Sequence, residues 1–168
     1  MTKEDVMIRL ATKRDASNIA NLIEQRAVAL NEQGSDQWTE YLEQDLLKRV
    51  ETDIASGDVY VYEQADAILA SIALLPPDEW DHALWEDGER GQYIHRIVVS
   101  EQLKGQGVGQ RLMQHVLEEA DGDEPIRLDC VADNAFLNDY YPRFGFVYVG
   151  SRNGYNTFEY KLEASVSA

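Results

Sequence analysis

The chain has 168 residues, of which 44% are hydrophobic, and this length predicts a single domain over residues 1–168 with one substantial core. Its formal net charge of -16 disfavours nucleic acid as a partner, because phosphates are repelled by such a surface. No apolar run is long enough to cross a bilayer and the N-terminus lacks a signal-peptide pattern, so we expect a cytoplasmic protein without a membrane partner.

The first half of the chain alternates between strand and helix patterns. The expected elements are a strand at 6–11, a helix from Asp15 or Ser17 to Leu30, a second helix from Thr39 to Ser56, and two strands at 59–62 and 67–75. The two strands are close enough in sequence to form an antiparallel hairpin. Residues 76–90 are less regular, contain Trp80 and Trp85 among several acidic residues, and are expected to separate the hairpin from the next strand.

A glycine-rich turn joins the most strand-like segment, residues 93–99, to an amphipathic helix that reaches Glu119. Gly105, Gly107 and Gly109 place free N–H groups and the positive end of a helix dipole together, which suits a phosphate or pyrophosphate. A P-loop is excluded, because Gln110 follows where that motif needs lysine. A dinucleotide-binding fingerprint fits the first two glycines but not Gln110, and the early hairpin disfavours that fold.

A second motif follows the expected strand 126–131. Asn134 and Tyr141 are seven residues apart, so they share one face of a short helix, and Pro142 and Gly145 end that helix. Strands are expected at 146–149 and 155–160, joined by a turn at Asn153-Gly154, and the tail from Glu163 is expected to be frayed.

Together, the two motifs resemble those of the GNAT superfamily of acyl-CoA-dependent N-acetyltransferases. The family's Gln/Arg-x-x-Gly-x-Gly/Ala signature is matched by residues 104–109, with Lys104 as a departure at its first position. Its second signature, an Asn, a Tyr seven residues later and then Gly-Phe, is matched by Asn134, Tyr141 and Gly145-Phe146. The resemblance implies an α/β fold with a mixed, mostly antiparallel central sheet, splayed at the cofactor cleft where pantetheine enters, and helices on both faces.

The resemblance also implies a function. An acetyl group moves from acetyl-CoA to the primary amine of a small molecule or peptide by direct attack in a ternary complex, and coenzyme A is released. A catalytically idle acyl-CoA-binding or sensor domain of the same fold is the alternative. A homodimer is left open, as is the role of the acidic charge, which suits either a cationic amine or solubility.

Cofactor binding is assigned to three groups of residues. Backbone groups of Ile97, Val98 and Val99 would pair with the pantetheine amides, and Asn134 would donate to the cofactor or simply cap its helix. The pyrophosphate would be held by the glycine turn, which comprises Lys104, Gly105, Gln106, Gly107, Val108, Gly109 and Gln110.

Candidate catalytic groups are fewer. Tyr141 is the expected general acid, since a phenol keeps its proton at neutral pH. Asp129 or His95 is the expected base, although a water chain would also serve and Asp129 could instead form an ion pair with Arg96 or Arg127. Acyl transfer requires no metal, and the histidines are scattered rather than spaced as metal ligands. Cys130 is interpreted as a buried small hydrophobe.

The acceptor pocket is the least specified part of the site. Gln37 and Trp38, between the first two expected helices, and Trp80, in the irregular segment, are candidates for lining it. Large aromatic residues are more often part of a core, and the acceptor itself is not identified by the sequence.

Overall fold

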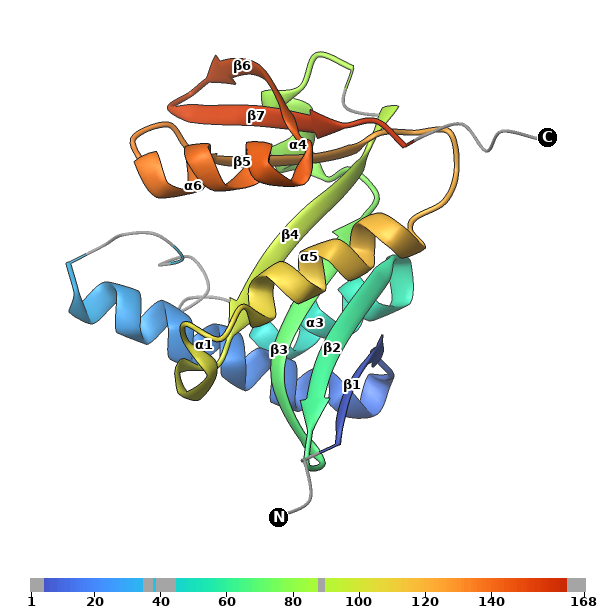
Figure 1. The fold of residues 1–168 in the computed structure, drawn as a ribbon, viewed down its shortest axis with the longest axis vertical. Coiled ribbons are helices and arrows are strands. Elements are labelled where there is room, and N and C mark those ends of the chain that lie inside the picture. The colour runs from blue at the N-terminus through green and yellow to red at the C-terminus, as the bar shows by residue number, and fades with distance from the viewer. Residues whose placement is uncertain (1–4, 35–37, 39–44, 88–89, 163–168) are drawn as a thin grey trace. The chain divides into compact units, whose positions relative to one another are not determined.

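A computed structural model describes residues 5–34, 38, 45–87 and 90–162 (Figure 1). In this part of the chain, seven strands form a sheet in the order β1-β2-β3-β4-β5-β7-β6. The strands are β1 (Val6–Leu10), β2 (Asp58–Gln64), β3 (Ala67–Leu75), β4 (Gln92–Val99), β5 (Ile126–Val131), β6 (Val147–Arg152) and β7 (Tyr155–Tyr160). The pairs β1–β2, β5–β7 and β6–β7 are antiparallel and β4–β5 is parallel. The expected mixed, mostly antiparallel α/β sheet is therefore confirmed.

The chain divides into two compact units, and the single domain expected over residues 1–168 stays a prediction. Unit 1 comprises Met1–Ala73 and Arg96–His115, and unit 2 comprises Leu74–His95 and Val116–Ala168. Strand β4 and helix α5 (Val108–Glu119) each contribute residues to both units.

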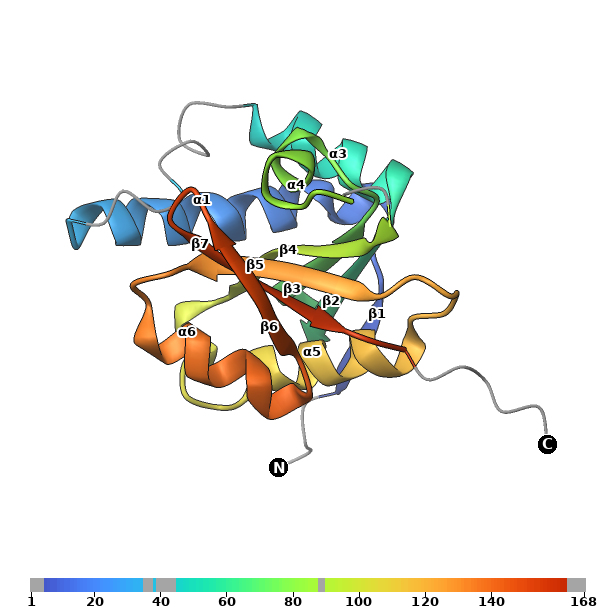
Figure 2. The same ribbon diagram turned by 90° about the horizontal axis from the view of Figure 1, so that it is seen from above.

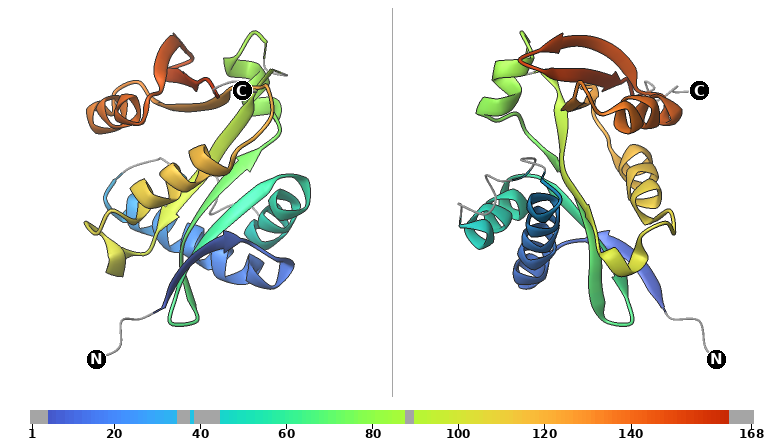
Figure 3. Two further views of the ribbon diagram at one scale, coloured as in Figure 1. Left: turned by 45° about the vertical axis from the view of Figure 1, so that its right-hand side comes forward. Right: turned by 90° about the vertical axis from the view of Figure 1, so that its left-hand side faces the viewer.

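Unit 1 is built on the β1–β3 strands with helices on both faces. Helices α1 (Ala16–Glu32) and α3 (Leu46–Ser56) lie side by side on one face and α5 lies on the other (Figure 3). Apolar residues that recur at helical spacing in α1 and α3 are buried, namely Ile19, Leu22, Ile23, Ala27, Leu46 and Val50. The expected start of the second helix at Thr39 lies outside the described residues; the described helix begins after Asp45, whose side chain accepts from the Lys48 N–H.

A buried ion pair lies in the core of unit 1. Arg96 Nε donates to Asp53 Oδ2 at 2.8 Å, and the side chains are 4% and 9% exposed. Arg96 has a φ of 53°, in the left-handed region that a non-glycine residue rarely adopts. The surrounding contacts therefore hold a strained backbone at the point where β4 passes to Ile97.

Unit 2 carries a short helix on each face of the strands β5 and β7. Helix α4 (Glu79–Leu84) and helix α6 (Ala135–Tyr140) lie on opposite faces (Figure 2). The irregular segment expected at 76–90 therefore contains a helix. Asp78 caps it, since its Oδ1 accepts from the Asp81 N–H at 3.0 Å while Asp81 Oδ2 accepts from the Asp78 N–H at 3.1 Å. The β6–β7 turn has the positive φ values expected of Asn153-Gly154, 56° and 85°.

The core of unit 2 includes a buried arginine. The Arg127 guanidinium lies 4.2 Å from the Trp85 ring centroid and pairs with Asp87 and Glu159 at 3.1 and 2.9 Å. Its Nη1 also donates to the Tyr93 hydroxyl at 3.0 Å. These contacts balance the charge and use the donors of a side chain that is only 5% exposed.

Candidate functional site

The glycine turn in unit 1 has the geometry of an anion site. Gly105 and Gly107 have φ values of 81° and 73°, and a Cβ added to either would meet no atom within 4 Å. The Arg111 N–H donates to the Gly107 carbonyl at 3.1 Å, so the earlier N–H groups of α5, at residues 108–110, precede the first intrahelical bond. The turn is therefore open on its outer side and presents free donors at a helix N-terminus.

A cation lies close to this turn in the sequence and was missed by sequence reasoning. Arg111 is in the first turn of α5, with its guanidinium 5.5 Å from the Tyr62 ring centroid and Nη1 at 3.4 Å from the Tyr62 hydroxyl. The side chain of Lys104, the departure from the family signature, is exposed. Both add positive charge near a site suited to phosphate.

Unit 2 brings both candidate bases to the face of the strands that α4 covers. Trp80 of α4 donates its indole Nε1–H to Asp129 Oδ2 of β5 at 3.1 Å, and its ring packs edge-on to Tyr155 at 4.8 Å. His95 of β4 contacts the same helix, with Nε2 at 3.1 Å from Asp81 Oδ2. One short helix therefore holds both the carboxyl group and the imidazole.

The environment of Asp129 adjusts its acidity. The surroundings of Asp129 raise its pKa to about 6; burial is the largest cause, and the nearby carboxylates of Asp81 and Asp78 act in the same direction. The Trp80 hydrogen bond and positive charge on His95 act in the opposite direction. Asp129 is thus ionised at neutral pH, and its pKa is close enough to neutral pH for the carboxyl group to accept and release a proton.

The two arginines that were the alternative ion-pair partners of Asp129 each pair with another carboxylate in the described residues. Arg127 pairs with Asp87 and Glu159, and Arg96 pairs with Asp53. Arg127 and Asp129 are two residues apart on β5 and share a face, but the Arg127 guanidinium lies against Trp85. In the described structure, Asp129 accepts a hydrogen bond from the indole of Trp80.

Tyr141 lies on the opposite face of β5 from Asp129. It begins the 3-10 helix η4 (Tyr141–Phe144), directly after α6, and its ring centroid is 6.1 Å from that of Phe158. Phe158 pairs with Leu128, the neighbour of Asp129 whose side chain points the other way. Tyr141 is 8% exposed, and burial raises the pKa of its phenol, so Oη keeps its proton at neutral pH.

Asn134 occupies the N-cap of α6. Its Oδ1 accepts from the Leu137 N–H at 3.0 Å, which confirms the capping role expected for it and leaves its side-chain amide N–H groups for a second partner. The helix expected over 134–141 is shorter than predicted, because the chain tightens into η4 ahead of Pro142. Cys130 is buried, and burial raises the pKa of its thiol to about 11, in keeping with a small core residue.

The remaining candidate residues are located in one or the other unit of the chain. Trp38 belongs to unit 1, Gln37 lies outside the described residues, and Trp80 belongs to unit 2 beside Asp129. Ile97, Val98 and Val99 belong to the unit 1 part of β4, where Val98 is buried. Their backbone role toward a cofactor, and that of residues 104–110, stays a prediction.

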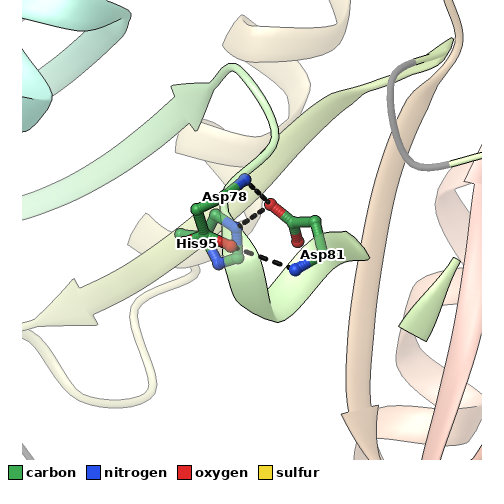
Figure 4. Close-up of side chains that lie close together, drawn as sticks. All are labelled: Asp78, Asp81 and His95. Carbon is green, nitrogen blue, oxygen red and sulfur yellow. Dashed lines mark hydrogen bonds and ion pairs between the residues drawn. The ribbon is translucent and has the colours of Figure 1, made fainter. Parts of the chain in front are cut away.

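Sequence reasoning missed Asp78 and Asp81, which lie beside His95 (Figure 4). Candidate metal-ligand atoms of these three residues lie within 4.8 Å of one another. Two of the contacts between them form the α4 capping box, and the third joins Asp81 to His95. The spacing Asp78-x-x-Asp81 was the available signal, since it is typical of a capped helix start.

Across residues 5–34, 45–87 and 90–162, no helix is both long and apolar enough to span a membrane.

The family model of the acetyltransferase (GNAT) family matches residues 23–146. The uncharacterized N-acetyltransferase YesJ of Bacillus subtilis (strain 168) is 37% identical over 160 residues, which cover 92% of this chain and 89% of YesJ.

Solved structures agree with this match. A GNAT-family acetyltransferase from Listeria monocytogenes has a TM-score of 0.78 at 31% identity, covering 96% of this chain and 99% of that one. The acetyltransferase yncA from Salmonella typhimurium, solved with its cofactor acetyl-CoA, has a TM-score of 0.67 at 17% identity, with 96% of each chain covered. By its motifs, its fold and these relatives, the chain belongs to the GNAT acetyltransferase family.

Proposed function

We propose that this protein transfers an acetyl group from acetyl-CoA to a primary amine by direct attack in a ternary complex. The observation that carries this proposal is the placement of Asp129 and Tyr141 on opposite faces of β5. One face then offers an ionised carboxyl group to an incoming ammonium, and the other offers a phenol proton to a departing sulfur.

The residues of the glycine turn fit a pyrophosphate. The open outer side of Gly105 and Gly107 and the free N–H groups of residues 108–110 supply donors without side chains in the way. Asn134 would donate from its side-chain amide, and the backbone of residues 97–99 would pair with the pantetheine amides. Acetyl-CoA, when bound, supplies the activated acetyl group.

The chain's own residues then manage two protons. At neutral pH the amine arrives mainly as an ammonium ion and must lose a proton before it attacks. Asp129 and His95 share this task, since charge on His95 affects the pKa of Asp129 and both belong to the α4 face. Tyr141 holds the second proton at Oη for the leaving sulfur.

An amine screen tests the proposal. Purified protein is mixed with acetyl-CoA and single amines, both small molecules and peptides, and the release of free thiol is followed. Thiol release that depends on the amine supports the enzyme. Tight acetyl-CoA binding without release across the panel would instead indicate the idle binding domain.

A substitution in the glycine turn should weaken cofactor binding. Gly107→Glu places a carboxylate and a Cβ at an open position with a φ of 73°, where the pyrophosphate approaches the backbone. We expect the dissociation constant of coenzyme A, measured by titration calorimetry, to rise at least about tenfold, or roughly 1.4 kcal/mol.

Gly122→Glu is the matched control, because Gly122 also has a positive φ, 97°, and open space around an added Cβ. It carries the same charge and a similar backbone strain but lies outside the turn. Equal coenzyme A affinity in the wild type and Gly107→Glu would show that this turn does not hold the pyrophosphate.

The pH dependence of turnover should identify Asp129. Asp129 must be ionised to accept a proton, so kcat/KM in the wild type should rise as pH increases through about 6. In Asp129→Asn, the rise of kcat/KM near pH 6 should disappear, and turnover at pH 7 should be about tenfold slower. Alkaline buffer should partly restore the rate of this variant, because more of the amine is then uncharged. The double variant with His95→Gln should lose about 10²-fold.

Trp80→Phe provides a second readout. It removes the indole N–H that lowers the pKa of Asp129, so the rise of kcat/KM should move to higher pH, while an aromatic side chain is retained at this position. If the profile of Asp129→Asn can be superimposed on that of the wild type, Asp129 has no part in the reaction, and His95 or a water chain has to accept the proton.

A further inference from the structure

The carboxylate of Asp81 is more deeply buried than a helix cap requires. Asp81 is 0% exposed, although it lies in the first turn of a short helix. Its Oδ2 accepts from the Asp78 N–H at 3.1 Å and lies 3.1 Å from His95 Nε2 (Figure 4). Capping carboxylates function well when solvated, so burial of this one has to be explained by something other than the cap.

The partner that explains the burial is His95. A buried carboxylate is costly unless it is paired, and the Asp81 Oδ1 atom is buried with no hydrogen-bond partner among the described residues. An ionised carboxylate only accepts hydrogen bonds, so His95 Nε2 must carry the hydrogen of this contact. The other ring nitrogen, Nδ1, is then the one with a free lone pair in the neutral imidazole.

Three charged groups of unit 2 lie around the imidazole. Asp81 and Asp78 face it from α4, and Asp129 of β5 interacts with it electrostatically. Asp81 is the only one of these with an oxygen at hydrogen-bond distance from a His95 ring nitrogen in the described structure. The low dielectric around a carboxylate with no exposed surface strengthens that contact.

We propose that Asp81 is a positioning residue that fixes His95 in the tautomer with hydrogen on Nε2, so that Nδ1 is the ring atom with which His95, together with Asp129, takes the proton of the acceptor amine. Asp81 acts through His95 and does not touch the substrate. The role of Nδ1 in the reaction rests on the proposed acetyl transfer, whereas the tautomer is a property of the resting protein.

Nitrogen-15 NMR of the histidine side chains measures the tautomer without any turnover. At a pH where His95 is neutral, the wild type should show a protonated Nε2 and an unprotonated Nδ1. Asp81→Asn should give a mixture of tautomers, because an amide side chain can either donate or accept. Its kcat should fall about 10- to 100-fold, with the acetyl-CoA dissociation constant unchanged.

Asp78→Ala is the matched control for the cap. It removes the side chain that accepts from the Asp81 N–H but leaves the Asp81–His95 contact, so it should keep the wild-type tautomer. This control and the wild type remain informative even if Asp81→Asn does not fold. A wild-type His95 with its hydrogen on Nδ1, or equal losses of kcat in Asp78→Ala and Asp81→Asn, would overturn the positioning role.

The two levels of the proposal fail in different ways. A wild-type protein that has the Nε2–H tautomer but transfers no acetyl group to any amine contradicts the proposed function, and with it the catalytic use of Nδ1. A protein that transfers acetyl groups but has the other tautomer contradicts only the role of Asp81.

Discussion

Replacement of Tyr141 with phenylalanine should lower kcat for acetyl transfer by about 10²- to 10⁴-fold, the usual contribution of a general acid. The variant loses one hydroxyl group and keeps the ring, whose centroid lies 6.2 Å from that of Phe146 and 6.1 Å from that of Phe158. The unfolding free energy should therefore change by no more than about 1 kcal/mol. Because burial raises the pKa of this phenol, the loss should be similar across neutral pH.

The kcat is measured by steady-state thiol release, and the affinity for acetyl-CoA is measured by direct titration of the same preparation. Tyr140→Phe is the matched control, since Tyr140 is the adjacent, half-buried phenol, stacked on Phe136 at 5.5 Å. Its kcat should stay within about twofold of the wild type. A fall in kcat of Tyr141→Phe matched by an equal fall in acetyl-CoA affinity would make Tyr141 a binding residue.

The largest loss of stability is expected from Asp53→Asn. Arg96 would remain buried without the carboxylate of Asp53, and breaking a buried pair from one side typically costs about 3–5 kcal/mol. For a chain of this size that corresponds to a fall in Tm of roughly 6–20 °C. The same substitution would remove the ion pair of Arg96, a residue whose φ is positive. Arg96 lies directly before the part of β4 that is proposed to bind pantetheine.

Thermal and urea unfolding of the purified variants would measure this loss. Asp139→Asn is the control, because its pair with Arg143 joins side chains that are 70% and 72% exposed and should contribute less than about 0.5 kcal/mol. A change of under 1 kcal/mol in Asp53→Asn would show that the Arg96 charge does not depend on Asp53.

Patterns local in the sequence predicted most of the fold. The apolar spacing of α1, the β-branched run of β4 and the turn at Asn153-Gly154 each depend on neighbours within a few residues, and these elements formed where expected. The glycine turn belongs to this class, because positive φ at Gly105 and Gly107 follows from the residue type. Asn134 likewise capped α6 as its position suggested.

The partners of the charged residues could not be predicted in the same way. Trp80 and Asp129 are 49 residues apart in the chain, Arg96 and Asp53 are 43 apart, and His95 and Asp81 are 14 apart. Opposite charges occur throughout this acidic sequence, so composition does not select among them. Helix α4 was missed because six residues give too few turns for a periodic pattern, although its capping residues were visible.

The most direct measurement of the central claim compares two products of one reaction. Protein, acetyl-CoA and an amine identified in the screen are incubated together, and coenzyme A and acetylated amine are quantified by mass spectrometry. The account predicts one acetylated amine for each coenzyme A released, with no acetyl group on the protein when the amine is left out. Coenzyme A release without acetylated amine, or a stable acetyl-protein that then passes its acetyl group to the amine, would contradict direct transfer in a ternary complex.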